Sequence, residues 1–468
     1  MASSSPIIIH TAILPETEEL HIEHIINIPK EIKPALHDIC CIYKVPPNLR
    51  NLNNGDSYTP QLISIGPFHH TKQELKPMHT QKQRYFLAFW ERVTNKKALV
   101  KYKNFLKENI EMIKNFYSEF DENIEDSLFV DMIMLDSVFI LELFLRKSKE
   151  SDRDKDYMFT TSWICKSIQR DLLLLENQLP IFLLEQLQQK VFKDSNNSLN
   201  FLELAFNYFE NFNPQRSNKH QTEEMLKNCK SCKHFTDLIR CFYLPKEVYD
   251  KGWSRSAHFT DVNSEDKCIL KTAKMLHDAG VSFEKVNHKS LLEIKFDKVP
   301  ILNWLLCLGC LPCFKFVNSK LLMSQFKVYQ HKECVLKNLI ALEQCHYSEQ
   351  PFICNYVSLI DALINTQEDV EILVDKEIIV HELGSHVELA TMINGLCKNV
   401  VVTCNYYGKT TKKLNGHYYN SWKNYMGVLR SVYFRDPWRF SSVVVGVVIF
   451  LVAIVNFLRF TGLYRPKY

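Results

Sequence analysis

Apolar residues recur at helical spacing along most of the chain. Between Tyr102 and Phe120 they repeat every three to four positions, and lysines and glutamates fill the opposite face. This pattern predicts an amphipathic surface helix. Residues 129–145 (FVDMIMLDSVFILELFL) are apolar nearly all round, which predicts a central, buried helix. We therefore expect a mainly helical body.

Two carboxylates interrupt the predicted central helix. Asp131 and Asp136 are five residues apart, which is about 500° around a helix, so they do not share a face. A paired acid site is therefore disfavoured. A buried carboxylate needs partners, so we expect each one to reach a helix N-terminus or a basic side chain.

A proline divides the apolar segment 168–188 (IQRDLLLLENQLPIFLLEQLQ). Pro180 cannot continue a helix without kinking it, but it is well tolerated in the first turn of a new one. The segment is predicted to form a helix, a tight break and a second helix. We expect Glu176, Asn177 and Gln178 to bond the freed backbone groups at the break.

Short strand-like runs occur at residues 291–296 (LLEIKF) and 325–329 (QFKVY), where a small hairpin or ribbon is expected. Polar, charged stretches at 147–156, 193–200 and 213–224 are typical of surface insertions. No internal repeat is evident, and no linker separates two independent cores.

An uncharged apolar run occupies residues 440–458 (FSSVVVGVVIFLVAIVNFL). It is long enough to cross a hydrocarbon core of roughly 30 Å, and its length and lack of charge disfavour a buried helix of a soluble protein. It predicts a transmembrane helix that contains Phe440, Val444, Gly446, Leu451 and Leu458. The residues expected at the two interfaces are Trp438, Arg439, Arg459 and Tyr464.

These features predict the fold class and the domain organisation. The expected fold is mainly α, with a large helical body, a small β-hairpin or ribbon and one C-terminal transmembrane helix. The expected segments are a flexible arm (1–38), the body (39–432), a juxtamembrane segment (433–439), the membrane helix (440–458) and a short tail (459–468). No Lys or Arg precedes Lys30, which disfavours a signal peptide. Without an earlier signal, the body is expected to face the cytosol, at the plasma membrane or an endomembrane.

The amino-acid composition disfavours several classes of protein function. The chain has 468 residues, of which 46% are hydrophobic, and only 12 glycines, which disfavours glycine-rich phosphate loops. Its net charge of +4 is too small for the basic surface of a nucleic-acid-binding protein. The 15 cysteines are an odd number scattered among apolar residues, which favours reduced thiols over a disulfide framework.

A zinc-protease motif is nearly present at residues 381–386 (HELGSH). That motif needs H-E-x-x-H, which places both imidazoles on one helix face. Here the second histidine is one position late, about 140° away around a helix. We expect a loop instead, with Ser385 as the N-cap of a following helix.

Two cysteine clusters are candidate metal sites. Cys229 and Cys232 form a C-x-x-C pair that needs two further ligands, and Cys241, His220 and His234 are close in sequence. The second cluster (CLGCLPC) lies in the apolar stretch 301–314, where buried thiols, lipidation beside a membrane and metal binding are all open; its cysteines are Cys307, Cys310 and Cys313. No catalytic set and no cofactor is expected.

Several strings together resemble the plant domain-of-unknown-function 247 family. They are IYKVPPNLR (42–50), YTPQLISIGPFHH (58–70), MHTQKQRYF (78–86), MLDSVFILELF (134–144), DLLLLENQLPIFLLEQL (171–187), LKNLIALEQC (336–345) and YFRDPWRFSS (433–442). The resemblance runs in order over nearly the whole chain. The chain departs from the family pattern in the inserted CLGCLPC, at Ser137, where glycine is usual, and at His79, where glutamate is usual.

The resemblance implies a plant, mainly helical, single-pass membrane protein without an established enzyme activity. Some family members lie at grass self-incompatibility loci, which implies recognition rather than catalysis. The leading hypothesis is thus a membrane-anchored interaction module that contacts lipid through its C-terminal helix, binds an unidentified protein and binds no nucleic acid. The alternatives are an enzyme with a metal-dependent site at the cysteine clusters, and a lipid-facing protein that uses residues 301–314 as a second membrane contact.

Overall fold

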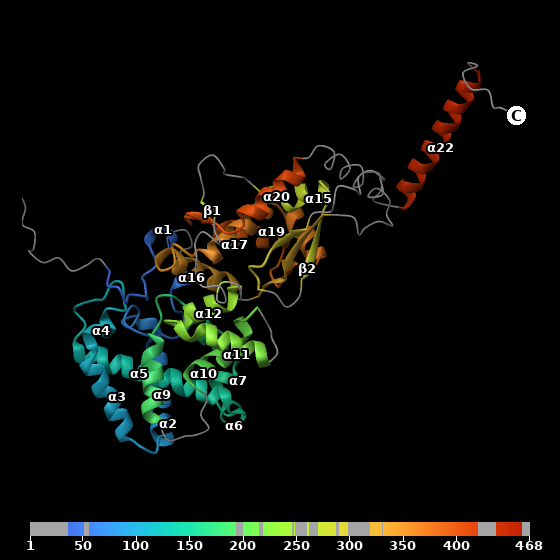
Figure 1. Ribbon diagram of the computed structural model, residues 1–468. Coiled ribbons are helices and arrows are strands. Elements are labelled where there is room, and N and C mark those ends of the chain that lie inside the picture. The colour runs from blue at the N-terminus through green and yellow to red at the C-terminus, as the bar shows by residue number, and fades with distance from the viewer. Residues whose placement is uncertain are drawn as a thin grey trace, which may run out of the picture. The chain divides into compact units, whose positions relative to one another are not determined.

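The computed structural model describes residues 36–50, 56–192, 200–214, 219–245, 248, 260–261, 270–286, 290–297, 319–329, 331–419 and 437–460. The chain divides between Asp38 and Ile39 into two units, and every described helix and strand belongs to the second. The described part is mainly helical with small sheets, as the sequence predicts (Figure 1).

The first half of the body is helical. Its longer helices are α2 (Lys76–Arg92), α3 (Lys97–Glu108), α5 (Asp126–Ser148), α8 (Ser162–Asp171), α9 (Ile181–Val191), α10 (Phe201–Tyr208), α11 (Lys219–Asn228) and α12 (Phe235–Tyr243). The short helical turns are α1 (Pro47–Arg50), η3 (Asp56–Tyr58), η4 (Gln73–Leu75), α4 (Ile110–Lys114), α6 (Glu150–Arg153), α7 (Tyr157–Thr160), η5 (Glu210–Phe212) and η6 (Cys229–Ser231).

The second half mixes helices with short strands. The strands are β1 (Thr260–Asp261), β2 (Val281–Val286), β3 (Lys295–Asp297), β4 (Ser319–Ser324), β5 (Phe326–Val328), β6 (Ile379–His381) and β7 (Cys404–Asn405). The helices are α15 (Ala273–Asp278), α16 (Lys332–Cys345), α17 (Phe352–Leu363), α18 (Gln367–Asp375), α19 (His386–Leu396), α20 (Gly408–Tyr418) and α22 (Pro437–Phe460).

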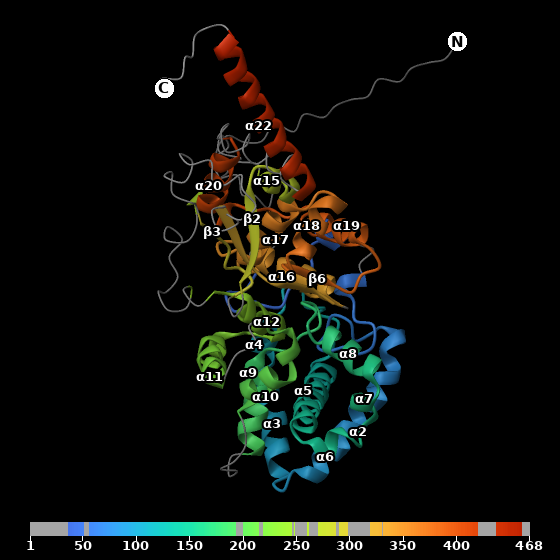
Figure 2. The same ribbon diagram turned by 90° about the vertical axis from the view of Figure 1, so that its right-hand side faces the viewer.

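Helix α5 is the buried helix that the all-round apolar pattern predicts. Phe139, Ile140 and Leu141 are fully buried in succession, so α5 has no wholly exposed face along this stretch. Helices α2, α3, α9 and α10 pack against it (Figure 2). The amphipathic window beside it forms two helices, α3 and α4, instead of one. The break falls at Asn109, whose side-chain amide donates to the Phe105 carbonyl (2.8 Å) and competes with helix continuation.

The two aspartates of α5 have separate partners, as their spacing predicts. Asp131 is largely exposed and forms an ion pair with Lys103 (2.6 Å). Asp136 is buried, forms an ion pair with Lys82 and accepts the Gly66 N–H (2.9 Å). Burial raises the pKa of the Asp136 carboxyl against the opposing effect of Lys82. No acid pair forms.

The break before Pro180 is confirmed, with α8 on one side and α9 on the other. The Asn177 side-chain amide donates to the Asp171 carbonyl (2.9 Å), and Gln178 donates to the carbonyls of Leu172 (2.6 Å) and Leu174 (2.8 Å). These bonds satisfy carbonyls that the end of α8 frees.

Glu176 does not share the role predicted for it at this break. Its carboxylate accepts the Val45 N–H (2.6 Å), lies 3.0 Å from His69 Nε2 and forms an ion pair with Arg50. These partners come from the segment that precedes α2, so Glu176 fastens that segment to the break.

The small β content is confirmed, but the predicted pairing is wrong. β4 lies between β2, which is parallel to it, and β3, which is antiparallel, in a three-stranded sheet. β5 pairs in parallel with β6, and β1 pairs with β7. The two predicted strand runs therefore belong to different sheets. Their partners are short runs whose strand character depends on burial in the folded chain.

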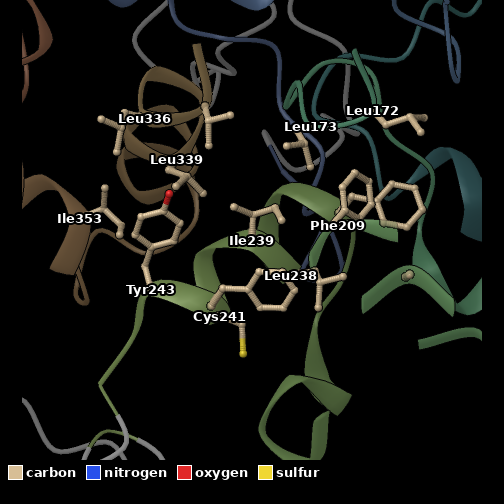
Figure 3. Close-up of a cluster of buried hydrophobic side chains, with 14 of the residues drawn as sticks. Leu172, Leu173, Phe209, Leu238, Ile239, Cys241, Tyr243, Leu336, Leu339 and Ile353 are labelled. Carbon is tan, nitrogen blue, oxygen red and sulfur yellow. The ribbon is translucent and has the colours of Figure 1, made fainter. Parts of the chain in front are cut away.

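One large apolar cluster spans both halves of the body, and α12, whose residues are all buried, contributes to it. Leu238 and Ile239 of α12 lie between two groups of aliphatic side chains (Figure 3). One group comes from the α8–α9 break and the other from α16; they are Leu172 and Leu173, and Leu336 and Leu339. Displacing α12 would therefore disturb both halves.

Gly66 has a left-handed backbone (φ 70°), and a Cβ there would lie 2.8 Å from the Gln178 carbonyl oxygen. Gly66→Ala is therefore expected to lower the free energy of unfolding by about 1–3 kcal/mol, measured by urea denaturation. Gly416→Ala is the control, because nothing lies within 4 Å of its added methyl group in α20. The control is expected to raise stability by about 0.5–1 kcal/mol. Equal stability changes in the two variants would contradict this account.

Helix α22 contains the whole of the predicted transmembrane segment, residues 440–458. Among the helices of the described residues, none combines the length and apolarity needed to cross a membrane. The transmembrane helix expected over 440–458 is therefore not supported.

The described side chains of α22 include the predicted Val444, Leu451 and Leu458. Val444 and Leu451 are exposed and Leu458 is half-buried. Trp438 and Arg459 are exposed, and an added Cβ at Gly446 would meet nothing within 4 Å. The side chains of Arg439 and Phe440, and residue Tyr464, lie outside the described residues.

Candidate functional site

A cavity of about 560 Å³ opens in the body where the two halves meet. Its walls come from α8, η5, α12, the β4–β5 segment and the start of α16. Tyr243, Phe326 and Leu291 supply apolar surface. A cavity of this volume, with mixed apolar and polar walls, is typical of a site for a small molecule.

Three lysines line the cavity: Lys166 of α8, Lys327 of β5 and Lys332 of α16. Within the described part of the chain, none of them forms an ion pair with a carboxylate. The Lys332 ammonium bonds the Tyr243 hydroxyl and lies 4.7 Å from the centre of that ring. Glu382 is the acidic residue among the described residues of the lining, so these residues carry an excess of positive charge.

His331 adds an unsatisfied donor or acceptor to the same cavity. Its Nε2 is buried and has no hydrogen-bond partner among the described residues. Its backbone is left-handed (φ 67°), a conformation that costs a non-glycine residue about 1–2 kcal/mol. Burial, assisted by Arg170 and Lys166, lowers the pKa of the imidazole. His331 is therefore neutral at neutral pH, with one ring nitrogen available to a ligand.

The cavity is better arranged to bind an anion than to attack a substrate. The Ser324 hydroxyl in its wall donates to the Ser290 carbonyl (2.9 Å), and His331 Nε2 has no bond to it. A serine nucleophile needs an adjacent base within hydrogen-bond reach. Lysines and a tyrosine hydroxyl are instead the donors that bind phosphate or carboxylate oxygens.

The structure also brings together part of the predicted cysteine site. Sulfur atoms of Cys229, Cys232 and Cys241 all lie within 4.8 Å of one another. His234 does not join them, because its Nε2 bonds the Cys41 carbonyl (3.0 Å). The side chain of His220 lies outside the described residues. All three cysteines of the second cluster also lie outside the described residues; they are Cys307, Cys310 and Cys313.

Comparison with known proteins decides the family. Residues 42–452 match the plant domain-of-unknown-function 247 family, described as "Plant protein of unknown function". The chain belongs to this family. It is similar to UPF0481 protein At3g47200 of Arabidopsis thaliana, with 29% identity over 88% of this chain and 84% of that protein. It is also similar to Putative UPF0481 protein At3g02645 of the same plant, with 23% identity over 93% of this chain and 96% of that protein. No solved structure matches.

Strings that carry the domain-of-unknown-function 247 resemblance hydrogen-bond to one another in the folded chain. The Ile65 N–H of IGPFHH donates to Asn177 of LLENQLP (2.6 Å). Gln178, from the same string, accepts the Phe235 N–H at the start of α12 (2.9 Å). These strings thus form a buried polar network that holds the family body together, and they do not line the cavity.

The HELGSH segment of this family member forms the expected loop. Ser385 is the N-cap of α19, and its hydroxyl accepts the Glu388 N–H (3.1 Å). His381 ends β6 and His386 begins α19, so the two imidazoles are not on one helix face. The predicted loop and the predicted N-cap at Ser385 are therefore confirmed.

Sequence reasoning missed the cavity residues of this family body. Lys327, His331 and Lys332 lie within six residues of one another, but Lys166 comes from a distant segment, and the four match no local motif. A left-handed histidine has no signature in the sequence, and lysines on a helix are ordinarily solvated. Only the folded structure shows that these side chains line one cavity.

His234, at the N-cap of α12, is expected to make the body of this chain sensitive to acid. Burial lowers the pKa of this imidazole to about 4, against an ordinary value of 6.5. The neutral ring donates from Nε2 to the Cys41 carbonyl, and its Nδ1 accepts the Asp237 N–H (3.4 Å). A proton on Nδ1 would remove that cap. The unfolded chain binds this proton first, so the stabilisation is full above pH 6.5 and is lost as pH falls toward 4.

The free energy of unfolding is expected to fall by about 3 kcal/mol over this range through His234. The measurement is urea denaturation at pH 7 and pH 4.5. His234→Asn is the control, because asparagine caps a helix without titrating. The variant should lose less stability on acidification than the unaltered chain. An identical loss in both would show that other groups carry the acid sensitivity.

Proposed function

We propose that this domain-of-unknown-function 247 protein is a non-catalytic recognition protein. Its body binds a small anionic ligand in the cavity at Lys332, and α22 attaches the protein to a membrane. The ligand-bound body then presents itself to a protein partner. The observation that supports binding is the convergence on one cavity of three lysines and a buried histidine nitrogen that, among the described residues, have no carboxylate partner and no hydrogen-bond partner respectively.

The ligand chemistry follows from these donors. An ammonium group has three donors, and Lys332 uses one on the Tyr243 hydroxyl, which leaves others for a ligand. Lys166 and Lys327 are exposed at the cavity and approach it from different elements. A phosphate or carboxylate group would accept bonds from several of these side chains at once. The apolar surface of Phe326 and Leu291 would cover a carbon skeleton.

Inorganic phosphate is the simplest probe of this proposal. Calorimetric titration of the full chain is expected to show saturable binding. The Lys332→Met variant, which keeps the length of the side chain, should bind at least tenfold more weakly, because a bond to a charged group contributes about 1.5–3 kcal/mol.

The matched control is Lys320→Met on β4, whose lysine pairs with Glu284 (2.9 Å) and does not line the cavity. This variant should bind phosphate as the unaltered chain does. Equal binding in the Lys332→Met and unaltered chains, or no saturable binding of phosphate at all, would contradict the proposed ligand site.

Membrane attachment is supported by the exposed apolar side chains of α22. Large hydrophobic residues rarely gather on one exposed surface unless something covers them. In α22 the exposed ones include Val445, Val448, Ile449, Phe450, Leu451, Val452 and Phe457. We propose that lipid covers them, and that the body lies on the cytosolic side of a plasma or internal membrane.

Flotation of the full chain with phospholipid vesicles tests this attachment. The unaltered chain should float with the vesicles, and a variant with Val448→Asp and Leu451→Asp should remain in the dense fraction. Charged residues cost about 2.5–3.5 kcal/mol each in the centre of an apolar helix in lipid. Ser441→Asp, at an exposed position near the start of α22, is the control and should still float. Flotation of the double variant would contradict lipid contact through α22.

A further inference from the structure

Three thiols converge where η6 meets α12. Cys229 begins η6, and the Cys232 N–H donates to the Cys229 carbonyl (3.1 Å), which closes the C-x-x-C turn. Cys241 comes from the last turn of α12, and its sulfur lies 2.7 Å from that of Cys229. Its side chain points away from Leu336 and Leu339 (Figure 3). The turn therefore places two sulfur atoms opposite a third that the helix supplies.

This arrangement differs from ordinary buried cysteines. Cys354 and Cys404, for example, are buried in two different elements, α17 and β7. A metal ion could be bound by cysteine, histidine or acidic side chains whose ligand atoms lie close together. Within the described residues, the three thiols of Cys229, Cys232 and Cys241 form such a group. Soft thiolate donors in tetrahedral geometry select zinc. Sulfur atoms bound to one tetrahedral zinc ion at 2.3 Å lie about 3.7 Å apart, within the span of this group.

We propose that Cys229, Cys232 and Cys241 bind one zinc ion, with a water molecule as the fourth ligand. Cys229 and Cys241 are buried and Cys232 is half-buried, so the open coordination position lies on the side of Cys232. Binding replaces the three thiol protons by the ion and releases those protons to solvent, and it requires no oxidant. The Cys229 and Cys241 sulfur atoms separate by about 1 Å to reach zinc-bound spacing.

The site would have a structural role. α12 carries Arg240, which pairs with Glu343 of α16, and Tyr243, which lines the cavity. A zinc ion would fix the C-terminal turn of α12 to η6 and hold these contacts in place. This role does not depend on ligand binding in the cavity.

Metal analysis of the purified full chain tests the proposal. Mass spectrometry of the metal content is expected to find about one zinc ion per chain. Substitution of cobalt for zinc should give the intense visible absorption of tetrahedral cobalt and the near-ultraviolet absorption of sulfur–cobalt charge transfer. Cys232→Ser, at the half-buried position, should weaken zinc binding at least tenfold, as the loss of a ligand requires.

Cys165→Ser is the matched control, because Cys165 is also half-buried and lies in α8, outside the thiol group. It should keep the zinc and the cobalt spectrum. Removal of zinc by a chelator should lower the melting temperature of the unaltered chain by more than it lowers that of Cys232→Ser.

Three results would overturn the proposal. A chain purified in the presence of zinc that holds no metal would do so. So would zinc that persists in Cys232→Ser with unchanged cobalt absorption, which would place the metal at other cysteines. A disulfide between Cys229 and Cys241, found by peptide mapping under non-reducing conditions in the metal-free chain, would assign this thiol group to redox chemistry instead.

Discussion

Replacing Glu343 with alanine is expected to lower the free energy of unfolding by about 3–5 kcal/mol. Glu343 is fully buried in α16 and accepts from Arg240 (2.9 Å) and from the Cys354 N–H (2.9 Å). Arg240 also donates to the Gln350 carbonyl (2.7 Å). Loss of the carboxylate leaves a buried guanidinium without its counter-charge and an unpaired N–H, and both desolvation costs are large.

Urea denaturation of the full chain measures this effect. The control is Asp131→Ala, which removes a carboxylate from the exposed pair with Lys103 and should change stability by less than about 1 kcal/mol. Burial raises the pKa of Glu343 against the opposing effect of Arg240, so charging this carboxyl is costly even in its pair. A double variant, Arg240→Met with Glu343→Leu, should therefore recover much of the loss. A change below about 1 kcal/mol in Glu343→Ala would contradict the packing of α12 on α16.

Asp171→Ala is expected to lower the free energy of unfolding by a similar amount, about 3–5 kcal/mol. The carboxylate of this fully buried residue accepts the N–H groups of Gln61 (3.1 Å), Leu62 (2.7 Å) and Ile63 (2.9 Å). It also forms an ion pair with Arg170 (2.7 Å), which is itself buried. Alanine would leave these donors without an acceptor at the end of α8.

Two further variants distinguish the loss of the buried acceptor oxygens of Asp171 from the loss of a negative charge alone. Asp171→Asn keeps one acceptor oxygen and should cost less than Asp171→Ala in the same urea measurement. Asp154→Ala is the control, because Asp154 is exposed and pairs only at the surface with Arg153 (3.2 Å). Equal stability of Asp171→Ala and Asp154→Ala would show that the end of α8 does not depend on this carboxylate.

Local features of the fold followed from local patterns. The all-round apolar run predicts α5 because a helix without a polar face has no solvent side, and Pro180 predicts the start of α9 because it cannot continue α8. The division of the 102–120 window at Asn109 was missed. A single asparagine in a helical pattern is only a weak sequence signal for a helix break. Whether its side chain bonds a backbone carbonyl and ends the helix depends on the packing of the folded chain.

Long-range features did not follow from the sequence. The partners of β3 and β5 were mispredicted because strand pairing depends on which segments the body brings together. The spacing of Cys229 and Cys232 identifies them as a pair. Cys241 is only close to them in sequence, and the structure shows that α12 places its sulfur beside theirs. The cavity lysines have no shared motif, so their convergence is visible only in three dimensions.

The most direct test of the recognition account is a crystal structure of the full chain soaked with tungstate, a heavy oxyanion with the tetrahedral shape of phosphate. We expect an anomalous-scattering peak inside the cavity, with tungstate oxygens at about 2.7–3.2 Å from Lys332 Nζ or His331 Nε2. Lys332→Met crystals soaked in parallel should lack that peak. Tungstate that binds only elsewhere on the chain, or that occupies the cavity equally in the variant, would contradict anion recognition at this site.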